Sequence, residues 1–276
     1  MALEESEVAA LRPDALTPAQ TEAKTEGIGV TKANMAVAKC FVSAILAGAF
    51  IGFGGMFFCL VLGDGSLPFA VQRLGGGLVF CLGLILVLCC GAELFTGNIL
   101  LLCAKASGKI SWGQTVKNWA LVWLGNLVGA LLVVFLVYFA QMAAMNGGAV
   151  GETMVSVAAG KVSPAWGTLF FKGILCNILV CLAVWIGFAG RTIADKVLGV
   201  LFPITAFVAC GFEHCVANMF FLPMGLLMNT LGVGEAGLIT LGGVLFNLSA
   251  ATLGNIVGGA LVALAYWFIY APRKKA

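Results

Sequence analysis

Charged side chains are scarce in this sequence. Asp, Glu, Lys and Arg make up only 10% of its 276 residues, whereas 61% are hydrophobic. Because a soluble domain of this size could not cover its surface with so few charges, the composition predicts an integral membrane protein in contact with lipid. The formal net charge of +3 gives no indication of a nucleic-acid partner, and none is expected.

The motifs of several enzyme and cofactor classes are also missing. The 10 cysteines lie in or beside apolar runs and none are spaced as Cys-x-x-Cys, so we predict packing residues, with no disulfide, redox pair or metal site. A hydrolase built on Cys215 or Ser249 would lack a Gly-x-Ser-x-Gly motif and a second histidine. The glycine runs at 52–55 and 75–77 fall within or beside apolar segments, where glycine lets helices approach closely. We therefore expect neither an enzyme nor a bound cofactor.

Long apolar runs are what the sequence does contain. They cover about residues 40–62, 74–103, 118–140, 168–189, 197–229 and 238–270. Since a bilayer core requires roughly 20 apolar residues per helix, we predict an all-α membrane protein with six spans. The second, fifth and sixth runs are long and glycine-rich, which predicts helices that break partway. The expected domains are a cytosolic N-terminal segment (1–38), a six-span transmembrane domain (39–271) and a cytosolic C-terminal tail (272–276).

The basic residues are unevenly divided between the two sides that six spans create. With both termini on one side, that side carries twelve of the 15 Lys and Arg residues, and the other carries only Arg73, Lys161 and Lys172. Cytoplasmic loops are enriched in Lys and Arg, so we predict cytoplasmic termini. Residues 1–38 have no basic start followed by a short apolar stretch and do not resemble a signal peptide; they are typical of a cytosolic amphipathic segment.

An internal repeat connects the two halves of the chain. CGFEHCVAN at 210–218 matches CGAELFTGN at 90–98, and TLGNIVGGALV at 252–262 matches WLGNLVGALLV at 123–133. The order of the matches predicts a duplicated unit of three spans. Because three is odd, the second copy must enter the membrane from the opposite face. Inverted repeats with broken helices are typical of transporters and channels, in which the pathway lies between the halves near the midplane.

Three ionisable residues lie in the repeated segments at the expected breaks. Glu93 and Glu213 occupy equivalent positions, so we predict that both cap the broken helix ends, where backbone N–H groups lack water; a direct role in transport is the alternative. His214 has no equivalent, since Leu94 stands opposite it. An ionisable residue at this depth usually faces a cavity or proton path, so we predict that His214 lies on the pathway. The alternative is a neutral histidine packed in the core.

These motifs carry a family resemblance. CGAELFTGN, KNWALVWLGNLVGALL, FFKGILCNILVCLAVW, ACGFEHCVANMF and TLGNIVGG together resemble the formate/nitrite transporter family, whose members include formate, nitrite and hydrosulfide channels. The resemblance runs from about residue 30 to 270. It implies an aquaporin-like protomer of six helices, two of them broken, in a homopentamer with a separate pore in each protomer. It also implies a location in the bacterial inner membrane.

The resemblance further implies roles for individual positions. It implies that His214 and Thr96 are the central polar pair of the pore, that Asn177 and Asn218 belong to the neighbouring hydrogen-bond network, and that Lys161 is an outward-side lysine that attracts anions or biases the histidine. The other implied residues are apolar side chains that narrow the path and a lysine of the cytoplasmic vestibule: Phe80, Leu84, Phe207 and Lys32.

The expected substrate is a small monovalent anion of a weak acid, with formate as the first expectation and protons as a further partner. AKASGKISWGQ at 104–114 resembles the formate channels, but GAELFTG and FFKGILCN resemble the nitrite channels, so nitrite and hydrosulfide stay open. Two routes across an apolar ring are open as well: a cationic His214 could hold the anion, or His214 could give it a proton so that neutral acid crosses; we prefer the second. A proton-coupled secondary transporter is the main alternative, and a purely structural membrane protein leaves the buried polar residues unexplained.

Overall fold

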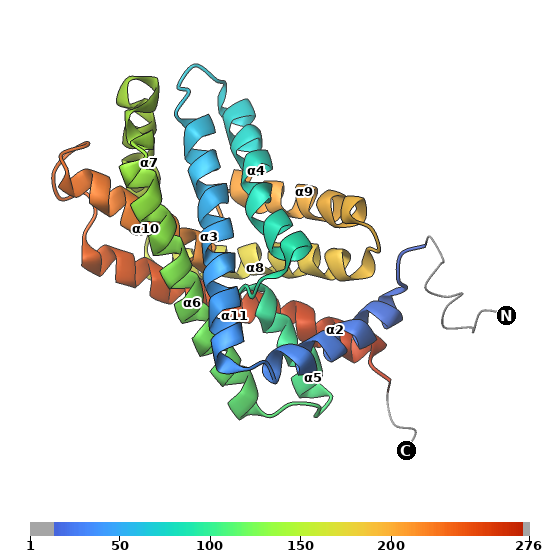
Figure 1. Ribbon diagram of the computed structural model, residues 1–276. Coiled ribbons are helices and arrows are strands. Elements are labelled where there is room, and N and C mark those ends of the chain that lie inside the picture. The colour runs from blue at the N-terminus through green and yellow to red at the C-terminus, as the bar shows by residue number, and fades with distance from the viewer. Residues whose placement is uncertain (1–13, 273–276) are drawn as a thin grey trace.

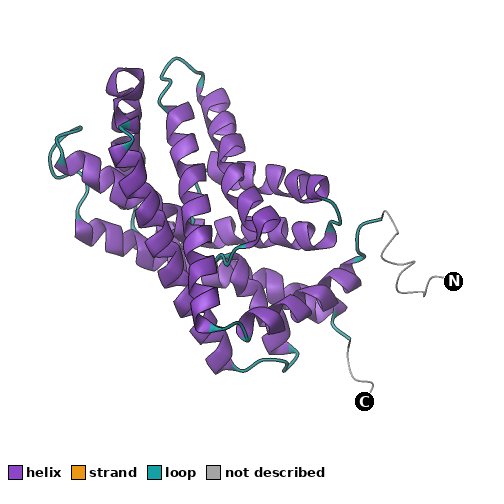
Figure 2. Ribbon diagram, in the orientation of Figure 1, coloured by secondary structure: helices purple, strands orange, loops and turns teal. Residues whose placement is uncertain are grey.

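The computed structural model describes residues 14–272, and the regular structure within them is helical throughout (Figure 2). A short helix, α2 (Pro18–Ala33), precedes the bundle. The first half contains α3 (Val37–Leu62), α4 (Phe69–Leu86), a π-helical turn (Val87–Gly91), a 3-10 turn (Gly97–Leu100), α5 (Leu101–Ala106) and α6 (Trp112–Phe139). After a 3-10 segment (Met142–Gly148), the second half contains α7 (Ala149–Val162), α8 (Trp166–Ala189), α9 (Ile193–Ala209), α10 (Cys215–Thr230) and α11 (Leu241–Tyr270).

The membrane crossings follow the apolar runs. Five helical segments are long and apolar enough to span a bilayer, and the shorter α10 completes a further crossing together with α9. The N-terminal and C-terminal ends of the described chain lie on the same side of the molecule (Figure 1). We call this the terminal side and the opposite one the distal side. The chain is therefore an integral membrane protein of six crossings.

Glycine in the left-handed region marks both breaks. The first crossing to break ends its helical part at Gly91, with φ +83°, and the next residue, Ala92, is extended. The second ends at Ala209, and Gly211 follows with φ +70°. Residues with a Cβ rarely adopt this conformation, so glycine is required at the equivalent place in each copy. The breaks predicted in the second and fifth runs are confirmed.

The break predicted in the sixth run is wrong. α11 is a continuous helix of 30 residues from Leu241 to Tyr270. Its glycines serve close packing instead: a Cβ on Gly254 or Gly258 would overlap a backbone carbonyl of α8. A glycine-rich run can break or pack, and composition does not separate the two outcomes. The first half contains the same arrangement, since a Cβ on Gly129 of α6 would overlap the carbonyl oxygen of Ile45 in α3.

α7 was not predicted from the sequence. It has 14 residues, too few to cross a bilayer, and packs mainly against α10 on the distal side. Its sequence mixes Glu152, Ser156 and Lys161 with alanine and valine, so it gives no continuous apolar run. This helix is nevertheless important, because it places Lys161 beside Glu213 at the second break.

The predicted N-terminal segment contains α2, which lies across the terminal side and packs against α5 and α8 (Figure 1). Thr17 and Gln20 form a capping box at its start. Lys24 Nζ donates to the carbonyl oxygen of Phe188 at 2.7 Å, and Glu26 binds Ser107 and Lys109. Residues 1–13 of the predicted segment, and 273–276 of the predicted tail, lie outside the described residues.

We expect the docking of α2 to weaken as pH rises, because Glu22 is buried on the same face as Glu26. Burial first, and then the neighbouring Glu26, raise the pKa of Glu22 to about 7 against a smaller opposing effect of Lys109. A carboxyl whose pKa is higher when docked than when free is bound more tightly in its protonated form. Its contribution therefore falls as pH rises from about 4.5 to about 7.

Hydrogen–deuterium exchange of the α2 amides at about pH 5 and pH 8, corrected for intrinsic exchange rates, would measure this effect across that window. We expect faster opening at pH 8 in the wild type and no such difference in Glu22→Gln. A pH difference that persists unchanged in the variant would assign the titration to another group.

Candidate functional site

The loops at the two breaks meet at a buried polar pair. Thr96 follows the first break and His214 the second, and Thr96 Oγ1 lies 2.9 Å from His214 Nε2. Both side chains are almost fully buried, with exposed fractions of 0% and 2%. The structure thus brings together the two residues that the sequence analysis paired, and their role in a pore stays a prediction.

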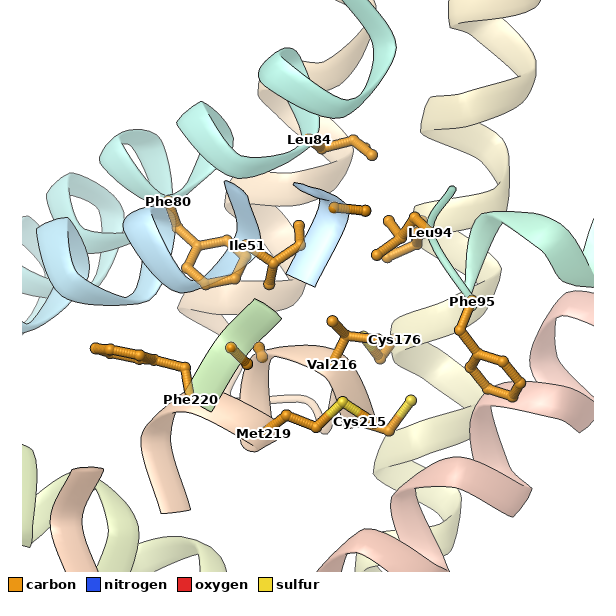
Figure 3. Packing of buried hydrophobic residues seen from close by; sticks show 14 of the residues in the cluster. Ile51, Phe80, Leu84, Leu94, Phe95, Cys176, Cys215, Val216, Met219 and Phe220 are labelled. Carbon is orange, nitrogen blue, oxygen red and sulfur yellow. The ribbon is translucent and has the colours of Figure 1, made fainter. Parts of the chain in front are cut away.

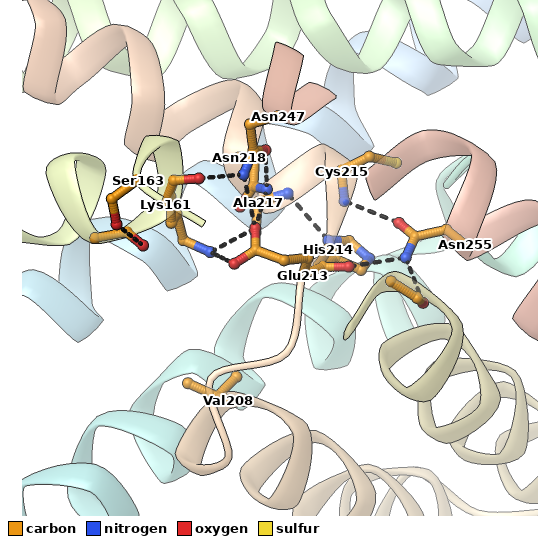
Figure 4. A network of polar contacts seen from close by, with 12 residues as sticks. Lys161, Ser163, Val208, Glu213, His214, Cys215, Ala217, Asn218, Asn247 and Asn255 are labelled. Atoms are coloured by element: carbon orange, nitrogen blue, oxygen red, sulfur yellow. Dashed lines mark hydrogen bonds and ion pairs between the residues drawn. The ribbon is translucent and has the colours of Figure 1, made fainter. Parts of the chain in front are cut away.

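The imidazole of His214 also caps the helix that follows it. His214 is the N-cap residue of α10, and its Nδ1 accepts a hydrogen bond from the backbone N–H of Ala217 at 3.0 Å (Figure 4). A backbone N–H is always a donor, so Nδ1 must be unprotonated in this arrangement. Nε2 therefore carries the hydrogen of a neutral imidazole and donates it to Thr96 Oγ1.

Two cavities approach this pair from opposite sides. The distal cavity has a volume of about 330 Å³, and His214 and Lys161 are among the residues that line it. The terminal cavity has about 350 Å³, and Lys32 and Glu93 are among its lining residues. The two cavities share no lining residue, so packed side chains separate them in this conformation.

Aromatic and aliphatic side chains form much of the separation. Phe80 of α4 and Phe207 of α9 meet edge to face, with ring centroids 5.8 Å apart, and both line the distal cavity. The Phe207 ring also stacks on His214 at 5.7 Å. Leu84, one turn further along α4, is buried among the apolar side chains of the core and lines neither cavity (Figure 3). Leu94, equivalent in sequence to His214, lines the terminal cavity.

A charged cluster supports the second break. Lys161 Nζ lies 3.2 Å from Glu213 Oε2, and Asn218 Nδ2 donates to the same carboxylate at 2.6 Å (Figure 4). Asn247 accepts from Asn218 at 2.7 Å and donates to the carbonyl oxygen of Lys161 at 2.7 Å. All members are therefore tied to one another and to the backbone, which stabilises ions that burial alone would disfavour.

The first break has an equivalent cluster on the terminal side. Lys32 Nζ lies 3.1 Å from Glu93 Oε1, and Asn98 Nδ2 donates to Glu93 Oε2 at 2.7 Å. Asn118 accepts from Asn98 at 2.9 Å and donates to the carbonyl oxygen of Lys32 at 3.3 Å. The four contacts match those of the second half one for one. The inverted repeat thus extends from the helices to individual hydrogen bonds.

The prediction that Glu93 and Glu213 cap the broken helices is corrected. Their carboxylates bind lysine and asparagine side chains, and other side chains accept from the free N–H groups at the breaks: His214 Nδ1 and two further asparagines. Asn126 Oδ1 accepts from the N–H of Phe95, and Asn255 Oδ1 accepts from the N–H of Cys215, both at 2.9 Å. A lysine within reach of each carboxylate is a stronger partner than a neutral backbone donor, which leaves the capping to uncharged side chains.

The remaining predicted residue, Asn177 of α8, joins the two halves. Its Nδ2 donates to the carbonyl oxygens of Thr96 at 3.2 Å and Asn255 at 2.7 Å, while its Oδ1 is buried without a hydrogen-bond partner among the described residues. The sequence prediction missed four asparagines: Asn118, Asn126, Asn247 and Asn255. The repeated Leu-Gly-Asn motif was a usable signal for Asn126 and Asn255. A polar amide that both copies carry in an apolar helix needs a hydrogen-bond partner in each copy.

The chain is similar to known membrane proteins over nearly its whole length. Residues 19–268 match the family model described as formate/nitrite transporter. The chain is 42% identical to the formate channel FocA of Escherichia coli (strain K12) over 271 residues, which cover 93% of this chain and 95% of that protein. Among the described residues, no group of three His, Cys, Asp or Glu side chains could hold a metal ion.

Solved structures agree with this comparison. A pentameric formate channel with formate bound has a TM-score of 0.80 and 41% identity, covering 86% of this chain and 98% of that one. The aquaglyceroporin of Plasmodium falciparum, at 15% identity and a TM-score of 0.57 over 86% of this chain and 98% of its own, shows that the fold is aquaporin-like. With these matches over nearly its whole length, the chain belongs to the formate/nitrite transporter family.

Proposed function

We propose that this chain forms a homopentameric channel in the bacterial inner membrane, with cytoplasmic termini, that conducts small anions of weak acids and above all formate. The observation that carries the proposal is the buried His214–Thr96 pair between two cavities, in a chain 42% identical to a formate channel. The pentameric relative with formate bound supports both the substrate and the assembly. Transport by this route requires no covalent chemistry, so we propose no enzymatic activity.

The apolar separation sets the physical problem. Moving a carboxylate-sized ion from water into a medium of dielectric constant about 4 costs on the order of 20 kcal/mol in the idealised limit, and several kcal/mol after relaxation. Phe80, Phe207 and Leu84 offer no hydrogen bond or charge that would offset this cost. A neutral acid avoids most of it, and we propose that the substrate crosses in this form.

The geometry of His214 changes where the proton comes from. Its Nδ1 is occupied by the Ala217 N–H, so the resting imidazole is neutral, and it becomes a proton donor only if that bond opens. We propose that Nε2–H serves as a hydrogen-bond donor to the substrate after Thr96 turns aside. The anion takes a proton from water in the entry cavity, and the acid returns it to water on the other side.

Each cavity has a lysine paired with a glutamate near its inner end. We propose that Lys161 and Lys32 draw the anion toward the centre, while their partners Glu213 and Glu93 keep each cavity from trapping it. Asn218 and Asn98 fix the carboxylates, and Asn177 fixes the backbone at Thr96. In this scheme the clusters position the entrance charges and take no part in proton transfer.

Liposomes that contain the purified pentamer test the proposal. We expect uptake of formate, and of nitrite or hydrosulfide, to alkalinise the outer solution in proportion to flux, with faster uptake at pH 6 than at pH 8 and little uptake of chloride. Electrogenic formate flux without a matching proton signal would contradict passage as the neutral acid. Flux that saturates and ceases to follow the formate gradient would instead favour a proton-coupled secondary transporter. Absence of formate uptake, with rapid nitrite or hydrosulfide uptake, would reassign the substrate.

A further inference from the structure

Arg73 connects α4 and α9, the two helices that carry the Phe80–Phe207 ring pair, which we call the distal constriction. It lies near the start of α4, and its Nε donates to the carbonyl oxygen of Ala209 at 2.9 Å while its Nη2 donates to that of Val208 at 3.0 Å. These carbonyls belong to the last turn of α9. The end of an α-helix leaves its last carbonyls without partners inside the helix, and a cation is the most favourable donor to them.

The turn that Arg73 holds is the one that leads into the second break. Gly211 follows directly, and Arg73 Nη2 lies 3.0 Å from the place where a Cβ on Gly211 would stand. The guanidinium therefore covers the turn as well as bonding to it. Glu213 and His214 come two and three residues later, so the position of this turn sets the start of the loop that presents the imidazole.

Arg73 also shares a helix face with the constriction. Phe80 lies seven residues further along α4, which is about two helical turns and places it on the same face. That face packs on α9 throughout: Gly77 approaches the Thr205 carbonyl closely, and Phe80 meets Phe207. Phe207 is the residue directly before the Val208 that Arg73 binds. Arg73 thus adds a charged tether to this packing, close to the ring pair.

The sequence repeat does not place an arginine opposite Arg73. The spacing that relates Glu93 to Glu213 places Ile193 opposite Arg73, and isoleucine has no donor for a helix end. The charged clusters at the two breaks match residue for residue, whereas the residue at position 73 differs between the two copies. Its contacts with α9 beside Phe207 therefore indicate the role of Arg73.

We propose that Arg73 is a positioning residue that sets the width of the distal constriction, and so the size of acid that passes, by holding the last turn of α9 against α4. This inference rests on the proposed function, since it concerns discrimination among weak acids. Arg73 acts through Phe207 and the Phe80 ring. Its charge also faces the distal cavity, which Lys172 lines as well.

The ratio of acetate to formate flux in liposomes separates positioning from simple anion attraction. We expect Arg73→Met to raise this ratio by about threefold or more, because a loosened constriction changes the passage of the larger acid most. Arg73→Lys, which keeps a cationic donor, should stay near the wild-type ratio. Lys172→Met is the matched control. It removes a charge from the same cavity, but within residues 14–272 the Lys172 side chain makes no hydrogen bond to α9. The acetate-to-formate ratio of this variant should therefore stay near the wild type even where formate uptake becomes weaker.

Three outcomes would overturn the proposal. Arg73→Met and Lys172→Met could weaken formate uptake alike, with an unchanged ratio and an effect lost at high salt, which would mean attraction by charge alone. Arg73→Met could lower only the melting temperature of the pentamer, which would mean a purely structural role. If Arg73→Met does not assemble, Arg73→Gln takes its place, and an unchanged acetate-to-formate ratio in that variant has the same meaning.

Wild-type protein without formate flux would defeat the proposed function itself. Normal wild-type flux with unaltered selectivity in the variants would defeat this inference alone.

Discussion

Replacing His214 by phenylalanine is expected to lower formate flux by roughly one to two orders of magnitude. The substitution keeps the ring stacked on Phe207 but removes the donor at Nε2 and the acceptor that caps the Ala217 N–H. Each lost hydrogen bond to a buried group costs about 1–3 kcal/mol, which corresponds to about ten- to hundredfold in rate when it falls on the transported species. Stopped-flow uptake in liposomes between about pH 5 and pH 8 would measure the change.

Thr96→Val is the matched control for that experiment. It removes the hydroxyl that binds Nε2 at rest but leaves the imidazole free to donate to the substrate. We therefore expect a smaller fall in flux, about tenfold or less. If His214→Phe kept wild-type flux and wild-type pH dependence, the imidazole would have no place in the pathway, and the buried pair would be structural.

The second large effect is expected from adding one methyl group to Gly129. Its Cβ would overlap the carbonyl oxygen of Ile45, a backbone atom that cannot turn aside as a flexible side chain can. Overpacking of this kind costs about 1–3 kcal/mol or more, and here it would push α6 away from α3 along their contact. We expect Gly129→Ala to lower the melting temperature and the yield of the pentamer in detergent, as measured by size exclusion and thermal unfolding.

Gly167→Ala provides the comparison within another membrane helix. No atom lies within 4 Å of a Cβ at that position, so alanine should be tolerated. Gly258→Ala should behave like Gly129→Ala, because its Cβ would overlap the equivalent carbonyl oxygen, that of Ile174. Equal tolerance of alanine at positions 129 and 167 would mean that the α3–α6 contact is looser than described here.

Much of the architecture could be predicted from the sequence because the duplication leaves repeated letters. The matching Cys-Gly-x-Glu segments gave both breaks, and each contains the glycine that the left-handed turn requires. The sixth run was mispredicted because its glycines resemble those of a broken helix in composition. Gly254 and Gly258 instead pack against the backbone of α8. Whether a glycine breaks its helix or allows close packing depends on the helix that lies against it, and that helix is distant in sequence.

The sequence indicated which residues form the site better than it indicated their hydrogen bonds. His214 stood out because it is the only histidine, and the resemblance indicated Thr96 beside it. Neither signal could assign the caps, since Asn126 and Asn255 reach the breaks from helices that come later in each half. The protonation pattern of His214 was also beyond the sequence, because it depends on the Ala217 N–H pointing at Nδ1.

The difference between Leu94 and His214 has a consequence for how such a pore can arise. Two identical, unlinked three-helix chains assembled as an antiparallel pair would have to carry the same residue at both positions, either two leucines or two imidazoles. Fusion into a single polypeptide releases that restriction, and each half can then mutate alone. The solitary imidazole, set beside a threonine contributed by the other half, therefore requires two halves that are no longer identical.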